Sequence, residues 1–371
     1  MPSSPPRYLA IDVMRGATLA LMIIVNMSIS EAKSYGPLLH ATWHGLTLTD
    51  LVFPSFLFVM GAAMSLTLPR YEAQGRGPML RKLARRTLLI FALGVLLYWF
   101  PFVQPGPGGG WVAKPLAELR VLGVLQRIAL CYALAALLLH VVGEVGTALV
   151  ALLLLLLNWW VLANLGDYTL AGNAALALDR WALGDAHLYH GEGIAFDPEG
   201  LLGTLPATVN VLAGYAAAAF LQRRGRDLQA VRLLLWAGAV CVVLGLAWDT
   251  VLPINKKLWT SSYVLVGVGV DFAVLALLVA VIDLAGKRAW TGFFAVFGKN
   301  TLFLYLLAEL AMSVLWTVPV QGRPAFEWIH ATWFEPWAGA KPGSLLFALV
   351  FMLGCWWVGR AMDRRGLYVK L

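Results

Sequence analysis

Charged side chains are scarce in this chain of 371 residues. Only 13% of the residues are Asp, Glu, Lys or Arg, whereas 60% are hydrophobic and the mean hydropathy is +0.75. A soluble domain carries roughly a quarter of its residues as charges. The low charge therefore excludes an ordinary soluble domain and predicts a membrane protein.

Cysteine is scarcer still. The three cysteines, Cys131, Cys241 and Cys355, all fall inside apolar runs. They form neither a disulfide framework nor a CxxC metal motif. His40 and His44 have HxxxH spacing, but no HExxH motif accompanies them, so we expect no metal site.

Long hydrophobic runs are abundant. Crossing a hydrocarbon core of about 30 Å takes about 20 apolar residues, and only helices satisfy every backbone polar group within one such run. We therefore expect an all-α polytopic membrane protein whose single domain, 1–371, is a bundle of about ten transmembrane helices. The predicted spans are 9–29, 49–68, 84–103, 121–142, 147–165, 204–222, 232–252, 262–283, 294–316 and 344–361.

The distribution of basic residues predicts the orientation. If the N-terminus is cytoplasmic, 18 of the 28 Lys and Arg residues lie on the cytoplasmic side, eight lie outside and two lie within spans. Cytoplasmic loops carry such an excess, so we expect both termini in the cytoplasm. The net charge of +8 then indicates contact with anionic lipid rather than nucleic acid. The predicted outer-face loops are 31–48, 104–118, 166–203 and 317–343.

Ionisable groups inside spans are costly and mark either a functional site or a buried structural pair. Asp12 and Arg15 share a helix face, so an ion pair and a ligand role both remain open. Asp271 has the same two readings, with Lys299 or Arg127 as its structural partner. The strongly polar residues within spans are Asp12, Arg15, Asn26, Asp50, Arg127, Asp271, Lys299, Asn300 and Glu309.

Three of the polar residues near the first outer loop suggest chemistry. His40 has the side chain best suited to move a proton near neutral pH or to accept an acyl group. Asn26 supplies a neutral donor for an oxyanion, and Asp50 is placed to bond one ring nitrogen of His40. A histidine that is merely structural or exposed is the alternative, and spacing alone leaves it open.

Seven motifs occur in order along the chain and resemble one family. Together they resemble the heparan-α-glucosaminide N-acetyltransferase family, including its bacterial NagX-like members. The resemblance implies a multi-pass protein of the bacterial inner membrane that transfers the acetyl group of acetyl-CoA to the amino group of a terminal glucosamine. The motifs are RYLAIDVMRG (7–16), VN (25–26), HATWHGLTLTDLVFPSFLFVMG (40–61), LRVLGVLQRIALCY (119–132), FDPEGLLGTLPATVNVLAGY (196–215), PINKKLWTSSYVL (253–265) and FGKNTLFLYL (297–306).

The resemblance also implies roles for individual residues. The catalytic histidine of the family falls on His40, its partner asparagine on Asn26 and its aspartate on Asp50. Substrate contacts are expected at Trp43 and His44, although His44 replaces the family's asparagine. The large lumenal extension of the animal enzymes is not found here, so a smaller amino sugar is the expected acceptor.

Binding of acetyl-CoA needs basic partners for its phosphates. Because the thioester is made in the cytoplasm and the candidate base lies towards the outer face, the pantetheine arm must thread the bundle. Arg127 and Lys299 are the first candidates for the phosphates, followed by Arg15, Lys256 and Lys257.

The remaining expectations concern the acceptor and the mechanism. Asp197 and Glu199 either bond the sugar or cap the helix at 204–222. We expect direct transfer, with His40 as general base and Asn26 at the oxyanion, and an acetyl-histidine intermediate is the runner-up. The rival hypotheses are a transporter for N-acetylglucosamine and a structural or assembly protein. Membrane lipids are the expected surroundings, and a homodimer remains open.

Overall fold

The structure is a computed structural model that describes residues 8–106 and 110–369. Most of this chain is helical. The helices are α1 Leu9–Asn26, α2 Val52–Glu72, α3 Arg76–Trp99, α4 Val124–Asn164, α5 Ala174–Leu183, α6 Leu201–Arg224, α7 Leu228–Asp249, α8 Ser261–Leu278, α9 Thr291–Lys299, α10 Thr301–Thr317, α11 Ala325–Ile329, α12 Glu335–Ala338 and α13 Ala340–Arg364. The strands form two antiparallel hairpins, β1 Val103–Pro105 with β2 Trp111–Ala113, and β3 Pro319–Val320 with β4 Arg323–Pro324.

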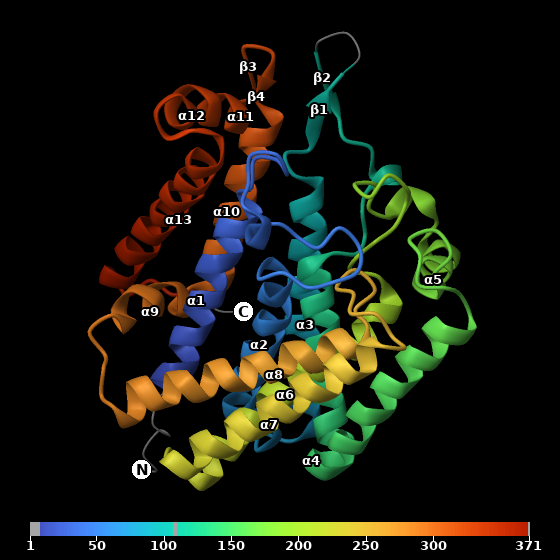
Figure 1. Cartoon of the computed structure of the whole chain (residues 1–371), viewed down its shortest axis with the longest axis vertical. Helices are drawn as coiled ribbons and strands as arrows, with labels where there is room; N and C mark the ends of the chain where they lie inside the picture. The colour runs from blue at the N-terminus through green and yellow to red at the C-terminus, as the bar shows by residue number, and fades with distance from the viewer. Residues whose placement is uncertain (1–7, 107–109, 370–371) are drawn as a thin grey trace.

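The expectation of a helical polytopic membrane protein is confirmed. Within residues 8–106 and 110–369, seven helices are long and apolar enough to cross a membrane, or eight if α9 and α10 form one span with its 82° bend. The count of ten differs for two reasons. α3 begins with a run of basic residues, and α4 joins the predicted spans 121–142 and 147–165 across Gly143, whose φ of 67° bends the helix (Figure 1).

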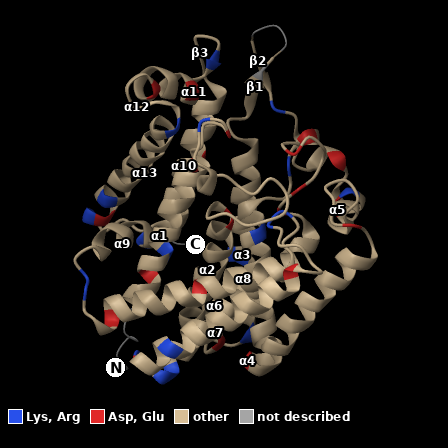
Figure 2. Ribbon diagram, in the orientation of Figure 1, with Lys and Arg blue, Asp and Glu red and all other residues tan. Residues whose placement is uncertain are grey.

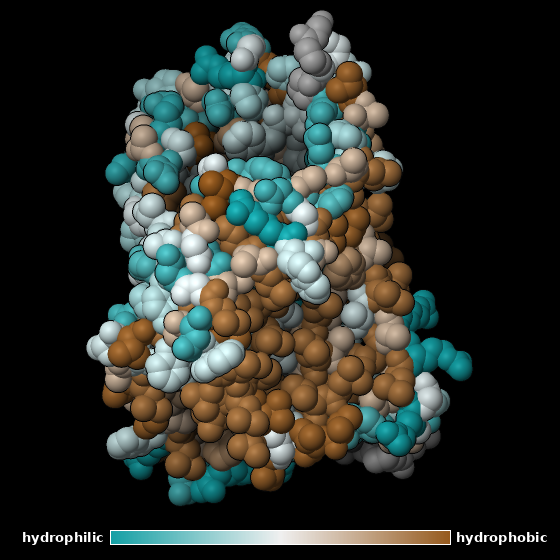
Figure 3. Space-filling model, turned by 90° about the vertical axis from the view of Figure 1, so that its right-hand side faces the viewer, coloured by the Kyte–Doolittle hydropathy of each residue, from teal (hydrophilic) through white to brown (hydrophobic). Residues whose placement is uncertain are grey.

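The surface pattern agrees with a membrane location. In Figure 3 a broad hydrophobic surface lies between hydrophilic caps at the top and the bottom of the molecule. We call the top the loop end, because it carries both hairpins and the 27–48 loop, and the bottom the basic end. Figure 2 shows Lys and Arg gathered at the basic end, near the start of α7.

The predicted outer-face loops contain regular structure. The 104–118 segment includes most of the β1–β2 hairpin, the 166–203 segment includes α5, and the 317–343 segment includes β3, β4, α11 and α12. Both hairpins lie at the loop end in Figure 1. These segments therefore cover the loop end of the bundle.

Two helix pairs pack with their backbones in contact. A Cβ atom added to Gly61 of α2 would lie 1.8 Å from the carbonyl oxygen of Val211 in α6, and one added to Gly16 of α1 would lie 1.8 Å from that of Phe294 in α9. Small residues permit such close approach and are a main source of helix association in lipid. The α1–α9 and α2–α6 pairs are therefore held at close approach.

Candidate functional site

Two cavities lie end to end within the bundle. The outer cavity, about 380 Å³, is lined by residues at the loop end that include His40, Asn26 and Glu199. The inner cavity, about 390 Å³, reaches towards the basic end and is lined by residues that include Arg15 and Lys299. The two cavities share three lining residues, Met22, Val124 and Tyr305. We call these three residues the junction.

His40 and Asp50 form a hydrogen-bonded pair at the outer cavity. The Nδ1–H group of His40 donates to Oδ1 of Asp50 over 2.6 Å. Asp50 Oδ2 accepts from the backbone N–H groups of Ala41 and Thr47 and from the Thr47 hydroxyl. Because these donors saturate the carboxylate, it accepts rather than donates and selects the Nδ1–H tautomer of His40.

The other ring nitrogen of His40 is then left as a base. Nε2 makes no hydrogen bond to another described residue, and the side chain, 44% exposed, lines the outer cavity. Burial by the surrounding protein lowers the pKa of His40, an effect that outweighs the opposing hydrogen bond to Asp50 and is reinforced by the nearby charge of Lys256. A neutral imidazole at physiological pH is the form that accepts a proton.

Asn26 is held by a residue distant in the sequence. Its Nδ2 atom donates to Oε1 of Glu309, in α10, over 2.8 Å. Because a carboxylate only accepts, this bond fixes the orientation of the amide and leaves one N–H and the carbonyl oxygen of Asn26 available. Asn26 and His40 both line the outer cavity, as the sequence predicts.

Arg120 organises the acidic wall of the outer cavity. It donates to both carboxylate oxygens of Asp197, at 2.8 and 2.7 Å, and to Glu199 at 2.6 Å. Its guanidinium carbon lies 4.8 Å from the ring centre of Tyr98 and 4.7 Å from that of Tyr189. Burial, the largest influence, favours the neutral form of Glu199, but the charges of Arg120, Lys256 and Arg127 together with the hydrogen bond from Arg120 outweigh it and hold the pKa of Glu199 below its ordinary value.

The two acidic residues predicted for the acceptor have different positions. Glu199 lines the outer cavity, whereas the Asp197 side chain is fully buried in its pair with Arg120. Neither residue caps the following helix. Asp179 does so, because its Oδ1 atom accepts from the Leu201 N–H at the start of α6.

Lys256 and Lys257 line the outer cavity rather than the inner one. Lys257 pairs with Glu192 at 2.5 Å and donates to the carbonyl oxygen of Thr42. The Lys256 ammonium group makes no hydrogen bond to another described residue, and burial lowers its pKa. Both lysines therefore line the cavity that contains His40, and neither lines the cavity that contains Arg15 and Lys299.

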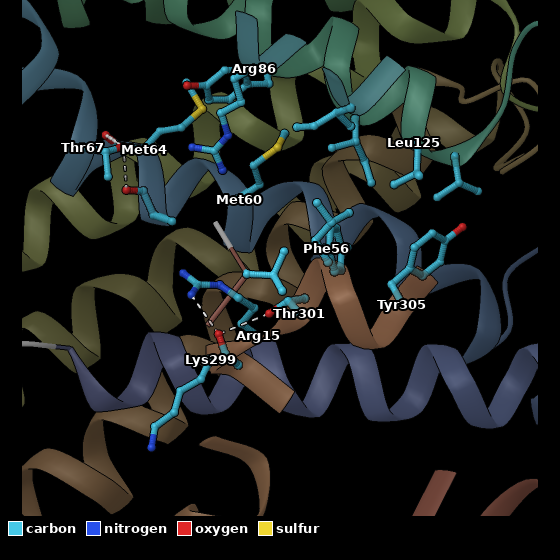
Figure 4. A pocket seen from close by; sticks show the side chains of 18 of the residues that line it. Arg15, Phe56, Met60, Met64, Thr67, Arg86, Leu125, Lys299, Thr301 and Tyr305 are labelled. Atoms are coloured by element: carbon cyan, nitrogen blue, oxygen red, sulfur yellow. Dashed lines mark hydrogen bonds between the residues drawn. The ribbon is translucent and has the colours of Figure 1, made fainter. Parts of the chain in front are cut away.

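The inner cavity holds a different set of cations. Arg15 and Lys299, both predicted to bind phosphate, line it together with Arg86 (Figure 4). Arg15 pairs with Asp12 at 3.4 Å, so the ion pair, one of the two alternatives left open by the sequence, is present, and Lys299 pairs with Asp363 at 2.7 Å.

Arg86 shows the least satisfied guanidinium of this set. Its guanidinium carbon lies 4.8 Å from the ring centre of Tyr132, and its buried Nε has no hydrogen-bond partner among the described residues. Arg15, Arg86 and Lys299 therefore all line one cavity that extends from the basic end to the junction, although the Lys299 side chain points away from the two guanidinium groups, towards its partner Asp363 (Figure 4).

Asn300 attaches the end of the described chain to the inner cavity. It breaks the helix between α9 and α10, donates from Nδ2 to the carbonyl oxygen of Leu367 and accepts from the Val369 N–H. Val369 lines the cavity. The segment after α13 therefore forms part of the cavity wall.

Besides Asp50 and Asp197, three further predicted site residues line neither of these cavities. Arg127 is fully buried, donates to the carbonyl oxygen of Gly200 and stacks on Trp259, so its position does not support a phosphate contact. Trp43 donates from Nε1 to the carbonyl oxygen of Tyr168, and His44 lies 3.3 Å from Asn255 Nδ2. Trp43 and His44 thus connect loops around the outer cavity rather than lining it.

Asp271 pairs with neither of the two basic residues that the sequence offers as structural partners. Neither Lys299 nor Arg127 reaches it, and its partner is the Ser55 hydroxyl at 2.5 Å. A hydroxyl group satisfies one oxygen of a buried carboxyl without bringing a second charge into the bundle. The ion-pair alternative for Asp271 is therefore wrong.

Arg120, Arg86, Tyr305 and Glu309 are the site residues that sequence reasoning missed. Arg120 and Tyr305 both stand inside motifs that carry the family resemblance, LRVLGVLQRIALCY and FGKNTLFLYL. Glu309 is one of the few ionisable residues within a span. Arg86 belongs to a basic cluster that the positive-inside rule already accounts for, so no signal separated it from its neighbours.

The fold and the site together define a class of protein. It is a multi-pass membrane protein with a histidine–aspartate pair at one cavity and a second, cationic cavity that shares three lining residues with the first. The family model described as heparan-alpha-glucosaminide N-acetyltransferase, catalytic, matches residues 7–245. The chain therefore belongs to the heparan-alpha-glucosaminide N-acetyltransferase family.

Two curated relatives carry the same description. The human heparan-alpha-glucosaminide N-acetyltransferase is 30% identical over 82% of this chain and 53% of its own length. The mouse heparan-alpha-glucosaminide N-acetyltransferase is 30% identical over 88% of this chain and 57% of its own length. The chain thus spans about half the length of the curated relatives that it matches. These comparisons give the transporter hypothesis no support.

Proposed function

We propose that this protein is a membrane-embedded acetyltransferase that moves the acetyl group of acetyl-CoA to the amino group of glucosamine or a glucosamine-terminated sugar. One observation carries the proposal. A cavity with a neutral base and a cavity with three cations meet at the junction, so a donor bound in one can deliver its acetyl group to the other. The family match supports the same reaction class.

The donor lies in the inner cavity in this proposal. Arg15, Lys299 and Arg86 bind its phosphates, and its pantetheine arm extends along the apolar wall to the junction. This assignment replaces Arg127, Lys256 and Lys257 as phosphate partners. Acetyl-CoA acts as a co-substrate and the scheme uses no metal ion.

The acceptor lies in the outer cavity. Glu199 and Glu192 offer carboxylate oxygens to its hydroxyl and neutral amino groups, and Lys256 keeps the cavity positively charged near His40. His40 Nε2 takes a proton from the amine as nitrogen attacks the thioester carbon, and Asn26 donates its remaining N–H to the oxyanion. Collapse breaks the C–S bond and releases coenzyme A, while the proton leaves His40 to solvent.

Orientation follows from the same scheme. We place the basic end and both termini in the cytoplasm, where acetyl-CoA is made, and count ten spans by including α3 and both halves of α4. The membrane is then the inner membrane of a bacterium, with its lipids around the hydrophobic surface.

The test is acetyl transfer by the purified protein. Labelled acetyl-CoA is incubated with a panel of amino sugars, and product is compared between the wild type, His40→Ala and the control His190→Ala, whose exposed histidine lines neither cavity. We expect transfer by the wild type and the control, and loss in His40→Ala with donor binding retained. Full activity of His40→Ala would refute the role of the base.

The same labelled donor separates the two mechanisms. In the absence of acceptor, acid quenching followed by peptide mapping detects acetyl label on a histidine. No label is expected for direct transfer. Label on His40 that is chased by added amino sugar would establish the acetyl-histidine route instead.

A further inference from the structure

Tyr305 occupies a place that the proposed function does not explain. It lies on α10, is 6% exposed, and is one of the three residues that line both cavities. The other two, Met22 and Val124, carry no hydroxyl or charge. In Figure 4 its side chain lies at the opposite end of the inner cavity from Arg15 and Lys299.

The hydroxyl group of Tyr305 is without a partner. It makes no hydrogen bond to any residue in the described ranges, whereas the Tyr98 hydroxyl accepts from Arg120 and the Tyr263 hydroxyl donates to the carbonyl oxygen of Asp50. Buried polar groups are normally hydrogen-bonded. A hydroxyl group that lines a cavity and lacks a protein partner is available to a ligand.

Helix register places Tyr305 next to the reaction. Asn26 follows Met22 by four residues on α1, and Glu309 follows Tyr305 by four residues on α10. The bond between Asn26 and Glu309, 2.8 Å, sets these two helix turns side by side. Met22 and Tyr305, two of the junction residues, therefore each lie one helical turn, about 6 Å along the helix axis, from the Asn26–Glu309 bond.

The proposed function determines which donor atom reaches the junction. With the coenzyme in the inner cavity and the acetyl group in the outer cavity, the sulfur atom that joins them lies where the cavities meet. We propose that the Tyr305 hydroxyl donates a hydrogen bond to this sulfur and stabilises the thiolate as it leaves. The inference rests on the proposed function and adds a catalytic residue to it.

The role is a hydrogen bond rather than a full proton transfer. The C–N bond forms and the C–S bond breaks, the electron pair stays on sulfur, and the amine proton passes to His40. A free tyrosine has a pKa of about 10 and a thiol about 8.5, so complete transfer from the phenol to the thiolate is unfavourable. The thiolate takes its proton from solvent after it departs through the inner cavity, which completes the balance.

The test removes only the hydroxyl group. In Tyr305→Phe we expect kcat to fall about 10- to 100-fold, the value of a hydrogen bond to a charged group, with the KM for acetyl-CoA changed by less than about threefold. The matched control is Tyr215→Phe. Tyr215 is 8% exposed, its hydroxyl makes no hydrogen bond to another described residue, and it lines neither cavity. The control is expected to keep the wild-type kcat.

A binding measurement supplies a readout that does not depend on turnover. Wild-type protein should bind coenzyme A more tightly than desulfo-coenzyme A, which lacks the sulfur, and Tyr305→Phe should lose that preference while retaining affinity for desulfo-coenzyme A. An unchanged kcat with an unchanged preference would overturn the inference. So would equal loss of both ligands, because it would show a structural role.

The two proposals fail in different ways. A wild-type protein that acetylates no amino sugar would contradict the proposed function, and the preference for the sulfur atom would then show that Tyr305 contacts it without catalysing transfer. An active enzyme with an unaffected Tyr305→Phe variant would contradict the role of Tyr305 alone.

Discussion

Replacing Asp50 by asparagine tests the orientation of the base. Asp50 Oδ2 accepts three hydrogen bonds, from the N–H groups of Ala41 and Thr47 and from the Thr47 hydroxyl. In Asp50→Asn the amide oxygen must keep these donors, so the new NH₂ group faces His40 Nδ1. His40 then has to accept at Nδ1 and carry its proton on Nε2. The lone pair is on the wrong nitrogen for the acceptor amine.

The magnitude follows from the value of a correctly oriented base. General-base catalysis contributes about 10²- to 10⁴-fold, and the equivalent substitution in a serine-protease triad costs about 10⁴-fold. We expect kcat in Asp50→Asn to fall within that range, about 2.7 to 5.5 kcal/mol in the barrier. Because the shape of the side chain is preserved at a site that is 1% exposed, the fold should persist.

The assay is steady-state acetyl transfer with detergent-solubilised protein, accompanied by a thermal unfolding curve. The double variant Asp50→Asn/His40→Ala should be no slower than His40→Ala, because both changes remove the same base. Retention of half or more of wild-type kcat by folded Asp50→Asn would refute the reasoning, as would additive losses in the double variant.

Three further predictions concern charge. Burial lowers the pKa of His40 and neutral imidazole is the active form, so the acidic limb of kcat/KM against pH should have its midpoint below 6.5. Lys256→Met should move this midpoint to higher pH, because it removes a positive charge that lowers the pKa of His40. Arg86→Ala should raise the KM for acetyl-CoA about tenfold. The KM for acetyl-pantetheine, which lacks the nucleotide phosphates, should not change. Arg85→Ala, at an exposed arginine, is the control. Arg120→Met leaves two buried carboxylates without their partner and should destabilise the protein by about 3 to 5 kcal/mol, measured by thermal unfolding against the wild type.

The transmembrane character was predictable because bilayer thickness fixes the length of an apolar run. Hydropathy does not report backbone continuity, however. The polar interruption at Gly143 and Glu144 suggested a loop, whereas the helix continues through it with one bent residue. α3 likewise begins at Arg76, eight residues before the predicted span, because the helix continues beyond the apolar part of its sequence.

The candidate site was predictable where the partners are close in sequence. His40 and Asp50 are ten residues apart, and their chemistry requires contact. Asn26 and Glu309 are 283 residues apart, so a costly carboxylate was recognisable but its partner was not. Arg127 shows the converse limit. A charge inside a span marks a buried group, but the sequence does not reveal whether it faces a cavity or, as here, an aromatic ring.

The backbone contacts at Gly61 and Gly16 limit how the inner cavity adapts to a ligand. The helices of the α2–α6 and α1–α9 pairs already lie at their closest approach, so their spacing cannot narrow and leaves no room for a larger residue at either glycine. The compliant part of the wall is instead the methionines, Met22, Met60 and Met64, whose unbranched thioethers change rotamer readily. Engineering for bulkier acyl donors should therefore begin with these side chains and leave the glycines untouched.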